Sequence, residues 1–545
     1  MRASDGRQES SASDRALSVG ERERRTLTAR AGIVSAGTFV SRVLGLGRDL
    51  VLAAVFSRGA TDAFFVAFTI PNVLRQLLAE GAVQNAVLPV LAKTREQGGD
   101  GATRELFEKL RGLSLLTLGL VSVLGVLFAP ALVELFAGGF HRHDGQFERT
   151  VALTRWVFPY IFFMGSAALG VAALNVYRRF VVTSFAPGLL NVAFIVAALT
   201  LPTLLERHGH DAILAMAFGA LAGGALQLVA QWPSLAAIGF LGRPALSLSD
   251  AGVRETLRRM GPTLLGIGVY YADVVIARRL LSDLDVGAQS YFGWALRLCD
   301  FPQGIFVMAL QSATLPSLSL LAARGEEREL ARTFAYGMRL TLFVGIAATL
   351  LFFSLAEPLV VMLFERGEFD RAAAHQTALA LMAQGAGIAA VAAVRQLVSV
   401  YFALGDTRTP VIVAACDLAT FIALAFLLRG AFGHVGIGMA VAGASGVQML
   451  LLWVLLKRRL PDLYTVEIVV SAARTLGVAL GAAAAAYGVA RAAGTWFDGA
   501  ASKLLPGGLG ALTFAAVFLL LARALRSPEL AAIAEPLSRR FRRSR

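Results

Sequence analysis

Long apolar segments recur along almost the whole chain, separated by short polar connections. We distinguish fourteen, most of them near the roughly 20 residues that a membrane-spanning helix requires. They cover residues 32–56, 63–92, 112–138, 152–177, 187–204, 211–239, 260–281, 288–320, 334–362, 376–403, 410–428, 434–456, 468–490 and 506–525. This pattern predicts an all-α polytopic membrane protein with about fourteen transmembrane helices. Several segments exceed 25 residues and contain Gly or Pro, so we expect tilted or kinked helices.

Composition supports a membrane protein and excludes several soluble classes. Of 545 residues, 56% are hydrophobic and only 16% are charged, whereas soluble domains carry roughly 25% charged residues. The only two cysteines, Cys299 and Cys416, exclude a disulfide scaffold and suggest no metal or redox pair. The net charge of +14 does not indicate a nucleic-acid partner, because the basic residues gather in the tails and in alternate connections. No connection exceeds about 20 residues, which leaves no room for an extramembrane catalytic domain.

The distribution of Lys and Arg predicts the orientation in the membrane. The two tails and the even-numbered connections hold about 32 of these residues, and the odd-numbered connections hold about 11. Cytoplasmic connections carry the excess of positive charge, so both termini are expected in the cytoplasm. We expect the polar, basic N-terminal tail to be disordered, and we find no cleavable signal peptide in it.

An internal repeat suggests how the segments are grouped. Residues 84–91 (QNAVLPVL) match residues 311–318 (QSATLPSL), each at the end of a long apolar segment. A weaker match pairs Val176-Tyr177 and Pro187 with Val400-Tyr401 and Pro410. The repeat unit is therefore six helices, which predicts two parallel six-helix lobes around a central cavity plus two C-terminal helices. The expected division is a tail (1–31), a first lobe (32–239), a second lobe (240–456), the C-terminal helices (457–527) and a second tail (528–545).

Eight arginines lie inside the apolar segments, where each costs at least about 2.5 kcal/mol at the bilayer centre and must face protein or water. They are Arg42, Arg48, Arg75, Arg155, Arg297, Arg339, Arg395 and Arg474. One interpretation of each is an ion pair that only fixes helix packing, and Arg155, Arg339 and Arg474 can also extend to an interface. The acids near the first-lobe arginines and Arg297 are too few to neutralise them all. Surplus arginine suits a multiply charged anion such as a diphosphate.

The residues around these arginines form a long motif. It consists of Phe39-Val40-Ser41-Arg42-Val43-Leu44-Gly45-Leu46-Gly47-Arg48-Asp49, Thr61-Asp62-Ala63-Phe64-Phe65-Val66-Ala67-Phe68, Pro71-Asn72-Val73-Leu74-Arg75 and Ala79-Glu80-Gly81-Ala82. This motif resembles the signature of the MurJ (MviN) family, the lipid II flippases of bacterial peptidoglycan synthesis in the multidrug/oligosaccharidyl-lipid/polysaccharide exporter superfamily. Similar positions continue through Phe158-Pro159-Tyr160, Asn175, Phe185-Ala186-Pro187, Met260-Gly261-Pro262 and Leu315-Pro316-Ser317-Leu318.

The resemblance implies fourteen helices, a central cavity and alternating access. It also implies that the segments 468–490 and 506–525 form a groove for the undecaprenyl tail. The substrate-binding residues that it implies are Arg42, Arg48, Asp49, Asp62, Arg75, Glu80, Arg297 and Asp300, the last in place of a more usual Glu. Two positions depart from the family pattern: Gln76 replaces a common second Arg, and Leu296 replaces an acid.

The resemblance further suggests a sodium site in the second lobe, formed by Asp273 and Asp417. Carboxylates suit a hard cation, but Val413 occupies the position of an expected Asn one turn before Asp417. The alternative is that Asp273 pairs with Arg278 or Arg279, or faces water.

From these features we expect a lipid flippase of the bacterial inner membrane and not an enzyme. It would move lipid II to the periplasmic leaflet, with the diphosphate bound by the arginines. No cofactor is expected beyond coupling to sodium or to the membrane potential. Partners would be lipid II, membrane lipid and the cell-wall synthesis machinery. Alternatives are a flippase for another polyprenyl-diphosphate oligosaccharide, a cation-coupled drug exporter, a membrane glycosyltransferase or ligase, and a purely structural role.

Overall fold

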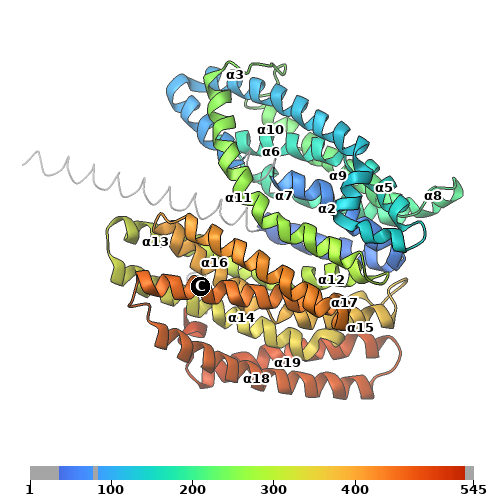
Figure 1. Ribbon diagram of the computed structural model, residues 1–545, viewed down its shortest axis with the longest axis vertical. Helices are drawn as coiled ribbons and strands as arrows, with labels where there is room; N and C mark the ends of the chain where they lie inside the picture. The colour runs from blue at the N-terminus through green and yellow to red at the C-terminus, as the bar shows by residue number, and fades with distance from the viewer. Residues whose placement is uncertain (1–35, 78–83, 534–545) are drawn as a thin grey trace, which may run out of the picture.

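The computed structural model describes residues 36–77 and 84–533, which are almost entirely helical (Figure 1). Within these two ranges there is no strand, and the single β-bridge, between Arg366 and Phe369, is isolated. This agrees with the predicted all-α class.

The first part of the chain forms one bundle of packed helices, drawn in blue to green in Figure 1. Its principal contacts are α7 with α9, α3 with α6, and α2 with α5. The elements are a helix at 36–55, α2 (Arg58–Arg75), α3 (Gln84–Leu127), α4 (Ala129–Ala137), η2 (Gly138–Arg142), α5 (Gln146–Val157), α6 (Tyr160–Val176), α7 (Phe180–Thr200), α8 (Pro202–Arg207), α9 (Leu214–Val229) and α10 (Trp232–Ala236).

A second bundle follows, drawn in light green to red, in which α14 packs against α15, α16, α18 and α19. Its elements are α12 (Ala288–Pro302), η3 (Gln303–Val307), α13 (Met308–Ala323), α14 (Glu327–Phe364), α15 (Arg371–Gly385), α16 (Ile388–Ala403), α17 (Arg408–Arg459), α18 (Thr465–Trp496) and α19 (Ala500–Ala524). The long α11 (Ala251–Leu281) contacts both bundles, through α3 and α4 on one side and α17 on the other. We call the two groups the first and second bundle.

Each of the fourteen predicted segments is mostly helical over its described residues, so their helical character is confirmed; the segment 211–239 is the most interrupted, with turns around its helices 214–229 and 232–236. Among the described residues, nine helices are long and apolar enough to cross a membrane. Kinks complicate a simple count. The 52-residue α17 contains two predicted segments that meet at Gly433, whose φ of 56° and ψ of −132° break the helix. A straight helix of this length would be about 78 Å long, far beyond a bilayer core of roughly 30 Å.

Small side chains allow the helices of the second bundle to approach closely. Ala479, Ala482 and Ala486 of α18 are fully buried, on the faces where α18 packs with α14 and α19. In a membrane such contacts depend on close van der Waals packing rather than on exclusion of water. These alanines therefore form part of the helix–helix interface.

A buried carboxylate just beyond α19 ties the two C-terminal helices to α14. Glu529 accepts hydrogen bonds from Arg339 of α14 at 2.7 Å, Arg474 of α18 at 2.6 Å and Ser471 of α18 at 2.8 Å. At the other end of α14, Lys503 of α19 pairs with Glu365 at 3.0 Å. Arg339 and Arg474 therefore fix helix packing through ion pairs, as one of the two interpretations of these arginines predicts, since both bind the same carboxylate.

Replacing Glu529 with Gln should reduce thermal stability. Burial alone would raise the pKa of Glu529, but hydrogen bonds from Ser527, Arg339 and Ser471 outweigh it and lower the pKa to about 2. Since this lies below the ordinary value of 4.5, the stabilisation is fully present above pH 4.5 and disappears as the pH falls towards 2. We expect a cost of about 2 kcal/mol at pH 7, the size of a hydrogen bond to a charged group. The cost is measured as a Tm shift of the detergent-solubilised protein and should shrink on acidification.

Glu467→Gln is the matched control for Glu529→Gln. The Glu467 side chain is half-exposed and lies 3.7 Å from Arg339, so its removal should change stability by less than about 1 kcal/mol. An equal loss of Tm in the two variants would contradict the clamp at Glu529.

Candidate functional site

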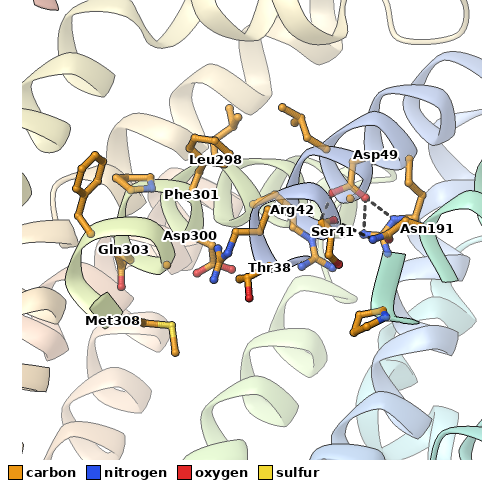
Figure 2. Close-up of a pocket in the computed structure, with 18 of the residues that line it drawn as sticks. Thr38, Ser41, Arg42, Asp49, Asn191, Leu298, Asp300, Phe301, Gln303 and Met308 are labelled. Atoms are coloured by element: carbon orange, nitrogen blue, oxygen red, sulfur yellow. Dashed lines mark hydrogen bonds and ion pairs between the residues drawn. The ribbon is translucent and has the colours of Figure 1, made fainter. Parts of the chain in front are cut away.

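A cavity of about 1160 Å³ lies between the two bundles and is lined by both. Figure 2 shows part of its wall. The first bundle contributes side chains from the helix at 36–55 and from α6 and α7, and the second contributes α12, η3, α13, α14 and α16. Its charged lining residues are Arg42, Arg48, Asp49, Arg297, Asp300 and Arg395. The cavity therefore carries four arginines against two aspartates.

Asp49 connects the two bundles within the cavity. Its Oδ1 atom accepts hydrogen bonds from Arg48 Nε at 2.9 Å and Nη2 at 2.7 Å, while Oδ2 lies 3.5 Å from Arg297 Nε. The Asp49 side chain is only 5% exposed, whereas that of Arg297 is 45% exposed. The guanidinium of Arg48 also lies over the ring of Phe194, 5.4 Å from its centroid. A single carboxylate thus partly compensates two arginines and leaves Arg297 open to the cavity.

Three of the four arginines act on Asp300, the second carboxylate of the cavity. Arg297, Arg395 and Arg42 all attract its carboxylate electrostatically, and Figure 2 shows Arg42 extending towards it. Within the described part of the chain, neither Arg42 nor Arg395 comes within ion-pair distance of a carboxylate. Their guanidinium donors are therefore available to an anion that enters the cavity.

Asp62 lies outside this cavity, where the two bundles touch. It is 1% exposed and accepts hydrogen bonds from the backbone N–H groups of Gly287 at 2.6 Å and Ser290 at 2.8 Å, and from the Ser290 hydroxyl. Gly287 and Ser290 begin α12, so the carboxylate occupies the positive end of that helix. Gly287 has φ 106°, which favours glycine.

Two further contacts join the bundles near Asp62. Arg58 of α2 pairs with Asp370, and the backbone N–H of Glu368 donates to the carbonyl of Ala54 at 3.0 Å. These contacts hold the two bundles together at this end, about 10 Å along α12 from Arg297.

The remaining predicted site residues lie elsewhere. Arg75, in the last turn of α2, donates to Asn72 Oδ1 through Nε at 3.0 Å and Nη2 at 2.9 Å, and does not line the cavity. Glu80 lies outside the described residues. The structure thus brings five of the eight predicted substrate-binding residues into one cavity: Arg42, Arg48, Asp49, Arg297 and Asp300.

Asp273 and Asp417 lie apart from the cavity, on α11 and α17, which pack together. The two carboxylates are close enough to repel one another. The Oδ1 atom of each is buried and has no hydrogen-bond partner among the residues that the structure describes. The alternative pairing of Asp273 with arginine was wrong, because Arg278 donates to Gln289 at 2.9 Å and Arg279 to Asp283 at 2.8 Å.

Sequence reasoning missed four polar residues of these sites. Arg395 was visible as an intramembrane arginine, but its helix carries no nearby acid to mark it as a cavity residue. Asn191, which donates to the carbonyl of Ser41 at 3.0 Å, interrupts an apolar run and could have been found by that signal. Gln303 and Ser290 gave no comparable signal.

Comparison with known proteins places this arrangement in a family. Residues 52–506 match the family model described as "Lipid II flippase MurJ". The chain belongs to the MurJ family. It is 33% identical to the "Lipid II flippase MurJ" of Burkholderia cenocepacia over 431 residues, covering 78% of this chain and 83% of the relative. It is 34% identical to the "Probable lipid II flippase MurJ" of Vibrio cholerae, covering 77% of this chain and 81% of the relative.

Solved structures show the same fold. A structure titled "Lipid II flippase MurJ, inward closed conformation" matches with a TM-score of 0.73 at 22% identity, covering 90% of this chain and 99% of that chain. An inward-facing MATE-family multidrug resistance transporter matches with a TM-score of 0.66 at 13% identity, covering 78% and 96%. The MurJ fold and the related exporter fold therefore describe this chain's architecture.

Replacing Asp62 with Ala should separate the bundles at the end that Asp62 holds. The change removes the acceptor of three hydrogen bonds, and a hydrogen bond to a charged group contributes about 1.5–3 kcal/mol. We therefore expect the fraction of molecules in which the two bundles are separated at this end to rise at least tenfold. Spin labels at Glu148→Cys and Ala372→Cys, with both native cysteines replaced, would report the distance. Asp144→Ala, an exposed position at the same end, is the control, and an unchanged distance in Asp62→Ala would contradict the role.

Proposed function

We propose that this protein flips lipid II from the cytoplasmic to the periplasmic leaflet of the bacterial inner membrane, with the diphosphate bound in the arginine-lined cavity. The observation that carries the proposal is the incomplete neutralisation of that cavity, in which four arginines face two aspartates. The named function of its relatives, lipid II flippase, supports the same substrate.

The geometry suggests how the diphosphate is held. Arg42 and Arg395 have guanidinium groups without a carboxylate partner among the described residues, and Arg297 has only a 3.5 Å contact to Asp49. Arginine grips phosphate oxygens through two parallel hydrogen bonds, and such charge-assisted bonds are the strong ones. Arg48 is more firmly held by Asp49 and acts as a fixed positive charge behind the other three.

Alternating access follows from the position of the contacts. The hydrogen bonds to Asp62 join the bundles at one end, which we assign to the periplasmic side. The substrate would enter from the cytoplasmic side, its lipid tail remaining in the bilayer along α18 and α19. Release would require the Asp62 contacts to break. We retain fourteen crossings, two parallel six-helix lobes and cytoplasmic termini as parts of this proposal.

A cation-coupled drug exporter is the second candidate, because exporters of the same superfamily share the fold. A net positive cavity repels cationic drugs, whereas it attracts a diphosphate. The charge of the lining therefore favours the lipid substrate. Another polyprenyl-diphosphate oligosaccharide would satisfy the same charges and remains the alternative substrate.

Rescue of a depleted bacterium tests the proposal. Depletion of the protein should lower lipid II in the outer leaflet while total lipid II rises. Wild type should reverse this, whereas Arg48→Ala, Arg297→Ala and Arg42→Ala, at normal membrane levels, should restore transport at least tenfold less well, because each removes part of the anion site. Arg155→Ala, outside the cavity lining, should rescue fully. Accumulation of a different glycolipid would overturn the substrate, and full rescue by the three cavity variants would overturn the site.

We also propose that Asp273 and Asp417 bind a sodium ion. Two buried carboxylate oxygens that lack a hydrogen-bond partner in the described part of the chain fit a cation, which would relieve their mutual repulsion. The described residues contain no cluster of three or more His, Cys, Asp or Glu side chains suited to a metal.

Sodium should stabilise the wild-type protein but not the variants of this pair. Asp273→Asn and Asp417→Asn should lose the sodium-dependent rise in Tm, and in sodium-free buffer each should be at least as stable as wild type because one repelling charge is gone. Potassium at equal ionic strength is the ionic control. A sodium effect that persists in both variants would place the ion elsewhere.

A further inference from the structure

The helix that carries Arg297 and Asp300 changes its hydrogen-bond register at the cavity. The α12 helix ends at Pro302, and Gln303–Val307 form a π-helical turn, in which the N–H of Met308 donates to the carbonyl of Gln303. Proline lacks the N–H that an α-helix would use at this point. Single π-helical turns are rare in proteins, but those that occur are often found at functional sites.

Gly304 of this turn receives the guanidinium of Arg42 from the other bundle. A Cβ atom placed on Gly304 would lie 2.0 Å from Arg42 Nη1 and 2.2 Å from Arg42 Cζ. Any other residue at position 304 would therefore displace the guanidinium. The obstacle is the end of a flexible side chain rather than backbone, so the helix itself could accommodate the change.

Arg42 is attracted to its surroundings, but in the described part of the chain its guanidinium makes no ion pair. Asp300, one turn earlier, attracts it but does not come within ion-pair distance. Gln303 is 7% exposed and lines the cavity, and its Oε1 atom has no hydrogen-bond partner among the described residues. At the π-helical turn, the guanidinium of Arg42 therefore lies against the backbone of Gly304, which has no side chain, and near only weakly polar groups.

We propose that Gly304 is a positioning residue for substrate binding: it provides the space in which Arg42 lies at the second-bundle wall of the cavity, ready to grip the diphosphate. This inference rests on the proposed function, since it requires the cavity to bind an anion. Gly304 itself touches no phosphate and acts through Arg42. The same space in the π-helical turn lets an arginine of one bundle reach the charges of the other.

Glycines in open surroundings provide matched controls for position 304. A Cβ atom on Gly119 of α3 or Gly477 of α18 would meet nothing within 4 Å. These residues are helical glycines in open surroundings, and alanine there should be neutral or stabilising because alanine favours the helix. They are the matched controls for Gly304.

The test measures binding of farnesyl diphosphate to the purified full-length protein in detergent. Gly304→Ala should weaken the affinity about five- to tenfold without lowering Tm, and Arg42→Ala should weaken it at least tenfold. The double variant should bind no more weakly than Arg42→Ala alone, because Gly304 acts through that side chain. Both single variants should lose affinity most at low salt, since the missing contact is ionic. Gly119→Ala should bind as wild type does.

The outcomes distinguish a failure of the role of Gly304 from a failure of the proposed anion binding in the cavity. If Arg42→Ala binds as tightly as wild type, the anion site itself fails. If Arg42→Ala is weakened but Gly304→Ala is not, only the role of Gly304 is overturned. Additive losses in the double variant, or a loss in Gly304→Ala that does not depend on salt, would show that Gly304 acts by a route other than Arg42 and would also overturn the inference.

Discussion

The cost of placing arginine inside a membrane governs the rest of this structure. Each such side chain must find protein, water or a ligand to face, and the chain meets this requirement in two ways. Arg339 and Arg474 share the buried carboxylate of Glu529 and are structurally satisfied. Arg42 and Arg395 lack any such partner within the described residues and face a cavity. This difference in neutralisation distinguishes the arginines that fix helices from those suited to binding an anion.

The carboxylates also fall into two groups, those paired with arginine and those bound by neutral groups. Asp49 is paired with arginine and restrains the cavity charges. Asp62 instead accepts hydrogen bonds from neutral groups at the start of α12. An ion pair pulled apart inside the protein leaves two unpaired buried charges, whereas separating Asp62 from α12 leaves only one. In the proposed transport cycle, the buried contact that opens at this end is therefore of the less costly kind, and the Arg58–Asp370 pair that opens with it is already partly exposed.

Much of this could be predicted from the sequence, because it depends on local pattern. Apolar runs determined the helices, and the family resemblance indicated five of the six charged residues that line the cavity. Pairings between distant segments were not accessible. Nothing in the spacing shows that Asp62 meets backbone N–H groups at Gly287 and Ser290, or that Glu529, after the last apolar segment, holds two intramembrane arginines. Arg75 was expected among the cavity residues because its helix carries the family motif, but the α2 register turns it towards Asn72.

One helix connects these features. At its first turn α12 contacts Asp62, at its middle it carries Arg297 and Asp300, and at its end the π-helical turn receives Arg42. A rigid shift of α12 that breaks the contact with Asp62 must also move Arg297 relative to Asp49 and Gly304 relative to Arg42, because both partners belong to the first bundle. Opening at one end and rearrangement of the anion-binding charges are thus mechanically linked through a single element. A bound diphosphate, by drawing the arginines towards itself, would act on that same linkage.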